Sequence, residues 1–144
     1  MTGHVRTVEA CRRVLEVTFP DLRVGRVRYL AEGWDSTVFE IDGGLVFRFP
    51  KRATVDETLR KELRLLPELG PRLPSAIPRF AYVSGPAAED PWHVVGYRKL
   101  PGTALIDHGV TSESVPAFAD DLARCLRALH AFPWDDAAGL GAPV

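Results

Sequence analysis

The sequence has few of the residues that mark secreted, membrane-spanning or metal-binding proteins. Its 144 residues include two cysteines without CxxC spacing, and we expect both Cys11 and Cys125 to be packed thiols. No run of about 18 apolar residues and no signal-peptide pattern occurs, so we expect a cytoplasmic chain without a membrane partner. The paired spacing that zinc or a catalytic dyad needs is absent for His4, His93 and His130.

A strong charge of either sign is also absent. The chain has 18 Lys and Arg against 19 Asp and Glu, a formal net charge of -1. Proteins that hold a nucleic-acid backbone present a strongly positive surface, so we expect no nucleic-acid partner. The length is that of one ordinary domain and allows one compact core.

The spacing of apolar residues predicts an α+β fold. Alternation with period two predicts five strands, and Asp42-Gly43-Gly44 predicts a tight hairpin between the second and the third. Thr54 and Glu57 form a capping-box pattern at the start of the middle helix. The tail 135–144 is expected to be a loop or a frayed end. The expected strands are 24–30, 38–41, 45–49, 79–83 and 92–100, and the expected helices are 7–18, 54–69 and 114–132.

The turn between the first two strands is the first candidate for chemistry. It runs from Ala31 to Thr37, and its backbone amides and hydroxyls are of the kind that hold phosphate oxygens. The alternative is an ordinary hairpin loop that is closed by Asp35 and Ser36. The candidate residues in this turn are Gly33, Asp35, Ser36 and Thr37.

A cation and a carboxylate form the second candidate. Alternation along 45–49 puts Arg48 on the strand face opposite the apolar residues, beside Val46. Glu62 falls within the apolar stripe of the following helix, where an unpaired carboxylate costs several kcal/mol. We therefore predict an Arg48–Glu62 ion pair. A purely structural salt bridge, or a Glu62 that reaches solvent, is the alternative.

The order of the candidate features along the chain is that of kinase-like lobes: a phosphate-covering turn, a cation on strand three, a carboxylate on the next helix and a strand entering a linker. Four segments carry these features: Glu32-Gly33-Trp34-Asp35-Ser36-Thr37-Val38, Leu45-Val46-Phe47-Arg48-Phe49-Pro50, Lys61-Glu62 and Gly96-Tyr97-Arg98-Lys99-Leu100-Pro101-Gly102. These segments resemble the aminoglycoside phosphotransferase family, which includes macrolide kinases. The resemblance spans nearly the whole chain.

The resemblance implies a purine-nucleotide site for ATP or GTP, with Mg in an intact enzyme. Arg48 stands where most kinases have the strand-three lysine that touches the α- and β-phosphates, and Glu62 stands where a helix glutamate orients that lysine. Arginine keeps the charge but changes the reach. Arg98 to Leu100 would be the hinge that binds the purine edge through its backbone. Tyr97 would lie at the back of the pocket, with Val46 and Ile41 in its roof.

The resemblance also implies an organisation and a limit on activity. We expect a kinase-like N-lobe at 1–100, a linker at 101–113, and at 114–144 the truncated start of a helical second lobe. The sequence has no asparagine and no His-Gly-Asp run, so the catalytic loop and the metal-binding aspartate are expected to be absent and the chain inactive alone.

Two uses of such a lobe remain open at this stage. One is a nucleotide-binding part of a small-molecule phosphotransferase, and the other is a non-catalytic scaffold or protein-interaction module. The apolar stripe of 114–132 would be covered by a second lobe, by self-association or by packing back on the lobe.

Overall fold

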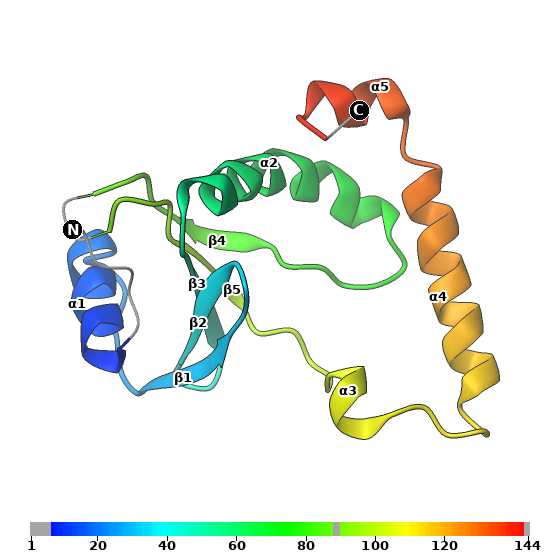
Figure 1. Cartoon of the computed structure of the whole chain (residues 1–144), viewed down its shortest axis with the longest axis horizontal. Coiled ribbons are helices and arrows are strands. Elements are labelled where there is room, and N and C mark those ends of the chain that lie inside the picture. The colour runs from blue at the N-terminus through cyan, green and yellow to red at the C-terminus, as the bar shows by residue number, and fades with distance from the viewer. Residues whose placement is uncertain (1–6, 88–89, 143–144) are drawn as a thin grey trace. The chain divides into compact units, whose positions relative to one another are not determined.

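The computed structural model describes residues 7–87 and 90–142, which form two compact units (Figure 1). The first unit comprises Met1–Leu63 and Pro78–Lys99, and the second comprises Arg64–Ile77 and Leu100–Val144. His4, which we expected to lack a metal-binding role, is outside the described residues.

The first unit contains an antiparallel five-stranded sheet, which confirms the α+β prediction. Its strand order is β1-β2-β3-β5-β4. The turn at Asp42 and Gly43, with φ of 52° and 70°, joins the second and third strands as predicted. The strands are β1 (Val27–Glu32), β2 (Ser36–Ile41), β3 (Leu45–Pro50), β4 (Phe80–Val83) and β5 (Val95–Arg98).

The hydrophobic core lies between one face of this sheet and helix α1 (Val8–Thr18). Thr7 caps the helix by accepting a hydrogen bond from the amide of Ala10, at 3.1 Å. Alternation along β2 and β3 directs their phenylalanine side chains and Ile41 to this face. The fully buried members include Phe39, Ile41, Phe47, Phe49, Cys11 and Leu15. Cys11 is therefore the packed thiol that we expected, and burial raises its pKa to about 12.

Helix α2 (Ala53–Leu69) begins earlier than its sequence pattern indicates. Thr54 was expected to cap it, but Thr54 lies inside the helix, and the carbonyl of Arg52 accepts from the amides of Val55 and Asp56. The capping-box prediction is therefore wrong. The helix ends at Leu69 as predicted, since the chain passes at Gly70 and Pro71 into the 3₁₀ helix η1 (Gly70–Arg72).

The second unit is helical. Helix α4 (Val115–His130) confirms the predicted C-terminal helix, but two short helices accompany it: α3 (Leu105–His108) in the expected linker and α5 (Trp134–Gly139) in the expected loop. The carbonyl of Pro133 accepts from the amide of Ala137, at 3.0 Å, so a proline starts the helix that a small, acidic sequence gave no reason to expect.

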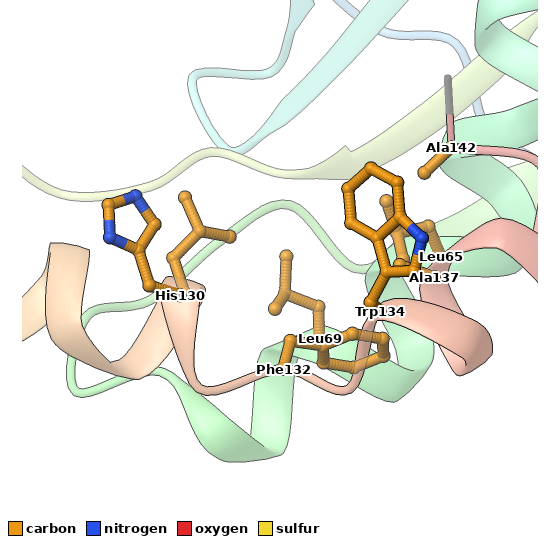
Figure 2. A pocket seen from close by; sticks show the side chains of 8 residues that line it. Leu65, Leu69, His130, Phe132, Trp134, Ala137 and Ala142 are labelled. Carbon is orange, nitrogen blue, oxygen red and sulfur yellow. The ribbon is translucent and has the colours of Figure 1, made fainter. Parts of the chain in front are cut away.

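An apolar pocket of about 370 Å³ lies within the second unit (Figure 2). The guanidinium of Arg72 stacks over the ring of Phe132 beside it, at 4.7 Å from the ring centre. No helix in the described parts of the chain is long and apolar enough to span a bilayer. The pocket is lined by Leu65, Leu69, Leu129, His130, Phe132, Trp134, Ala137 and Ala142.

Candidate functional site

An ion pair joins β3 to α2 on the sheet face opposite the α1 core. Nη1 of Arg48 donates to Oε2 of Glu62 at 2.7 Å, and Nη2 reaches Oε1 at 3.4 Å. Both side chains are half-buried, with 22% and 28% of their surface exposed, so water screens the pair only in part. The predicted Arg48–Glu62 ion pair is thus confirmed, and its carboxylate keeps part of its surface in contact with solvent.

Tyr97 and Val46 lie on the same sheet face beside this ion pair. They are direct cross-strand partners, two register positions from the Arg48–Val95 pair. Burial raises the pKa of the Tyr97 phenol, the charge of Arg48 opposes that rise, and the charge of Glu62 adds to it. The phenol therefore lies within the electrostatic reach of both members of the ion pair.

The loop between β1 and β2 is held by the two residues that follow β3. Lys51 Nζ donates to the Gly33 carbonyl at 2.6 Å, and its backbone amide donates to the Asp35 carbonyl at 3.0 Å. Arg52 Nη1 donates to the Trp34 carbonyl at 2.9 Å. Three successive loop carbonyls thus have partners in the segment 51–52. Sequence reasoning missed Lys51 and Arg52, because only the folded chain brings them to the loop.

The amide side of the same loop is open. No described residue accepts a hydrogen bond from the amide N–H of Trp34 or of Asp35, and the indole of Trp34 is 93% exposed. The Gly33 amide bonds to the Ser36 carbonyl at 3.0 Å, which closes the turn. Successive backbone N–H groups without a protein acceptor are a feature of anion-binding turns.

Ser36 and Thr37 lie within β2 rather than in the loop. Ser36 pairs with Pro50, which puts it on the face of Arg48, and its buried hydroxyl has no hydrogen-bond partner among the described residues. Thr37 pairs with Phe49 on the core face and is fully buried. The expectation that the Thr37 hydroxyl reaches a phosphate is therefore wrong, since strand alternation turns it away from Arg48.

The expected hinge begins at the end of β5. Arg98 pairs with Leu45, and the amide of Lys99 donates to the Gly44 carbonyl at 2.9 Å, so that amide already has a partner. Leu100, with 36% of its surface exposed, is the first residue of the segment Leu100–Val144, which belongs to the second unit. Ile41 was expected in the roof with Val46, but it lies in the α1 core on the opposite sheet face.

A buried carboxylate connects the sheet face to the hinge. Glu40, which pairs with Val46, is 4% exposed and binds Nζ of Lys99 at 3.1 Å and the guanidinium of Arg28. These two hydrogen bonds lower the pKa of the Glu40 carboxyl, in the order Lys99 then Arg28. Lys99 is thereby fixed through both its amide and its side chain.

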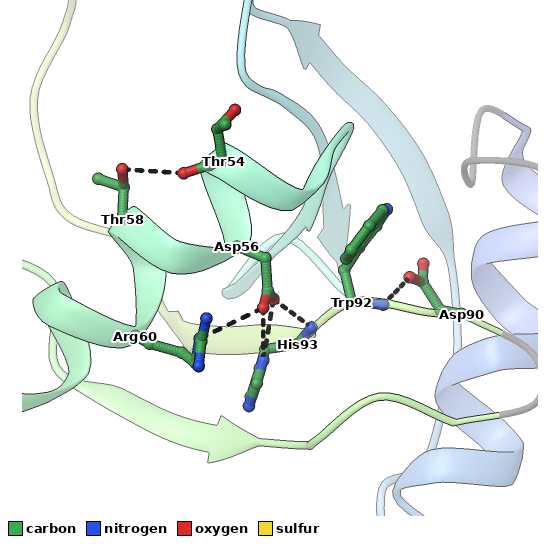
Figure 3. Close-up of polar contacts among 7 residues, drawn as sticks. All are labelled: Thr54, Asp56, Thr58, Arg60, Asp90, Trp92 and His93. Carbon is green, nitrogen blue, oxygen red and sulfur yellow. Dashed lines mark hydrogen bonds and ion pairs between the residues drawn. The ribbon is translucent and has the colours of Figure 1, made fainter.

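The first turns of α2 are anchored to the segment before β5 (Figure 3). Asp56 Oδ1 accepts from the backbone amide of His93 at 2.7 Å and lies 2.9 Å from its Nδ1. Arg60 lies 3.5 Å from Oδ2 of the same carboxylate. This anchor holds the helix that carries Glu62. No group of three potential metal ligands occurs in the described part of the chain. His93 has a structural role through its contacts with Asp56.

Comparison with known proteins then decides the family. The family model described as phosphotransferase enzyme family matches residues 26–143. The chain belongs to this family. No curated protein matches it. Among solved structures, the GDP complex of wild-type aminoglycoside 2'-phosphotransferase-IIIa is 30% identical, with a TM-score of 0.89 over 96% of this chain and 47% of that one.

Two other solved structures extend the likeness across this phosphotransferase family. The macrolide 2'-phosphotransferase MphH from Brachybacterium faecium, an apoenzyme, is 28% identical, with a TM-score of 0.70 over 93% of this chain and 46% of that one. The streptomycin-ATP-APH(2")-IIa ternary complex is 23% identical, with a TM-score of 0.67 over 94% and 44%, and supports the fold alone. The chain spans about half the length of the structures it matches.

Proposed function

We propose that the chain binds a purine nucleoside triphosphate as the nucleotide-binding lobe of a small-molecule phosphotransferase. The observation that carries the proposal is the Arg48–Glu62 ion pair on the sheet face shared with the unpartnered Ser36 hydroxyl. A guanidinium fixed by a carboxylate keeps donors free for a phosphate in a set orientation. Solved relatives in complex with GDP support a purine nucleotide as the ligand.

Each candidate residue has a place in this proposal. The amides of Trp34 and Asp35, following Gly33, meet the phosphates together with the Ser36 hydroxyl. Val46 and Tyr97 face the base. The purine edge bonds to backbone groups between Arg98 and Leu100, and the Lys99 amide is excluded from this role because Gly44 already accepts from it. Thr37 has a structural role beneath the loop.

The proposal assigns nucleotide binding without phosphoryl transfer to this chain. Transfer to a hydroxyl requires an aspartate that accepts the proton and ligands for Mg²⁺. The sequence contains no asparagine and no His-Gly-Asp run. We therefore expect Mg²⁺ to act only as a partner of the nucleotide here. The acceptor class, aminoglycoside or macrolide, a role in antibiotic resistance and a cytoplasmic location belong to the intact enzyme that the relatives suggest.

Calorimetric titration with GTP and ATP, with and without Mg²⁺, tests the proposal. Wild-type chain should bind at least one of them, and Arg48→Ala should weaken binding by about tenfold or more, the effect of losing one charge-assisted hydrogen bond. Arg79→Ala, which removes an exposed arginine before β4, is the matched control and should bind as wild type does. Equal affinity of Arg48→Ala and wild type would remove Arg48 from the site.

A scaffold or protein-interaction module is the second candidate function. The observation in its favour is the row of apolar side chains along α4, each 41–47% exposed. Absence of binding at millimolar GTP and ATP would favour this candidate over the first. The row consists of Val115, Phe118, Leu122, Leu126 and Leu129.

A further inference from the structure

The β1–β2 loop carries two carboxylates close to where the proposed function puts a triphosphate. Glu32 ends β1, and Asp35 is the last loop residue before β2. Uncompensated, these charges would repel a bound polyphosphate. A loop of this composition therefore needs compensating cations to serve as a phosphate cover.

Lys51 and Arg52 supply those cations. Lys51 Nζ lies 2.6 Å from Oε1 of Glu32, and Arg52 Nη2 lies 2.6 Å from Oδ1 of Asp35. The same two side chains donate to loop carbonyls, as described above. The formal charges of the four residues sum to zero, so the loop is neutral as well as anchored.

The carbonyl side and the amide side of the loop have opposite surroundings. The carbonyls of residues 33, 34 and 35 all point to donors in the segment 51–52. The amides of Trp34 and Asp35 have no acceptor among the described residues. A peptide unit held by its carbonyl presents its N–H in the opposite direction, because the two groups are trans across the planar amide. Fixing the carbonyls therefore fixes the direction in which the N–H groups point.

The side chains of Lys51 and Arg52 differ in how deeply they are buried, and therefore in how strongly their ion pairs hold the loop. The Lys51 side chain is 17% exposed, whereas the side chains of Arg52 and Asp35 are 53% and 64% exposed. Exposed ion pairs contribute little because water and salt screen them. Lys51 therefore makes the more strongly held contacts of the two.

We propose that Lys51 is a positioning residue that neutralises Glu32 and holds the Gly33 carbonyl, so that the loop amides face the phosphates of a nucleoside triphosphate. This inference rests on the proposed function and adds a residue that acts on the phosphates through the loop. Arg48 meets the phosphates from β3, whereas Lys51 orients the loop that covers them. Replacing Arg48 should therefore remove a direct phosphate contact, whereas replacing Lys51 should release the loop that covers the phosphates.

The test compares Lys51→Met, Lys51→Arg and the matched control Lys61→Met in the full chain. Lys61→Met removes the same charge from an exposed position on α2. Calorimetry with GTP and ATP, and with guanosine and adenosine, measures the phosphate contribution separately from the base contribution. Lys51→Met should lose about tenfold or more in triphosphate affinity and less than about twofold in nucleoside affinity, whereas Lys51→Arg and Lys61→Met should stay within about threefold of wild type for both ligands.

Hydrogen exchange without nucleotide gives a second readout, which separates this inference from the proposed function. In Lys51→Met the two hydrogen-bonded amides that close and hold the loop, those of Gly33 and Lys51, should exchange at least about tenfold faster than in wild type, while those of α1 and the β2–β3 hairpin are unchanged. Unchanged loop exchange overturns the inference, as does an equal loss of triphosphate and nucleoside affinity. A wild-type chain that binds no nucleotide overturns the proposed function and the phosphate role of Lys51 with it, and the exchange rates then still decide whether Lys51 holds the loop.

Discussion

At the scale of single residues, Gly96 shows how closely the core and the candidate site share one sheet. It pairs with Phe47, whose ring fills the space where a side chain at position 96 would be. A Cβ there would lie 2.3 Å from Cε1 of Phe47, far inside van der Waals contact. Phe47 also packs against Phe19 and Tyr82, with ring centres 5.9 and 5.4 Å apart, so it has little room to move.

Gly96→Ala should therefore lower the free energy of unfolding by about 1–3 kcal/mol, the usual cost of overpacking a core. Urea denaturation followed by circular dichroism measures it as a lower midpoint at an unchanged slope. Gly44→Ala is the matched control, because no atom lies within 4 Å of its added Cβ, and should change stability by less than about 0.5 kcal/mol. Equal midpoints for the two variants would contradict the packing argument.

Residue-scale prediction from the sequence succeeded where strand alternation alone determines the outcome. The sides of β3 taken by Arg48 and Phe47 follow from period two, and the carboxylate in the α2 stripe then has one nearby cation. Lys51 escaped prediction because its partners, Glu32 and Gly33, are 18 or 19 positions away across a loop. Thr37 was misassigned because the strand begins one residue before it.

At the scale of elements, the segment before β5 contains a buried charge next to the anchor of α2. Asp90 is 2% exposed, Oδ1 accepts from the Trp92 amide at 2.9 Å, and Oδ2 has no partner among the described residues. Burial raises the pKa of this carboxyl to about 6, the Trp92 amide opposes the rise, and the charge of Asp56 adds to it. The ionised form of Asp90 is therefore unfavourable in the folded chain.

Asp90→Asn should stabilise the chain at neutral pH and not in acid. Between about pH 4 and pH 6 the folded state binds more protons at this site than the unfolded state, so this contribution to stability is present below pH 4 and is lost as pH rises through 6. Asn has no ionised form and keeps the acceptor for Trp92. Thermal or urea unfolding should find the variant more stable by on the order of 1–2 kcal/mol at pH 7, with the two curves converging near pH 4. Parallel pH profiles would show that burial does not disfavour the Asp90 charge.

Element boundaries were harder to predict than element order. All five strands and the helices α1, α2 and α4 were expected in sequence order, because periodicity and Gly or Pro stops mark them. The start of α2 differs because its first hydrogen bonds go to the carbonyl of Arg52, whose side chain is held by the β1–β2 loop. Helix α5 was not predicted because its six residues show no helical spacing of apolar side chains. Both depend on contacts that local sequence does not encode.

At the scale of the whole molecule, the two units differ in how well they cover their apolar surface. The first unit buries its large side chains between the sheet and α1, whereas α4 of the second unit leaves a row of five apolar side chains about half exposed. Linear boundaries in the sequence cannot describe these units, because α2 contributes residues to both. An exposed apolar row of this kind drives association unless something covers it.

In a solution of the purified chain, we expect a second copy to cover α4. Sedimentation should therefore find a mass that rises with concentration above the 15.9 kDa of one chain. Leu122→Gln combined with Leu126→Gln should keep the mass at that of one chain, because it removes the centre of the apolar row, whereas Arg127→Gln on another side of α4 should associate as wild type does. A wild-type mass of one chain at every concentration, together with fast amide exchange throughout α4, would exclude self-association and leave this helix face for a different protein surface.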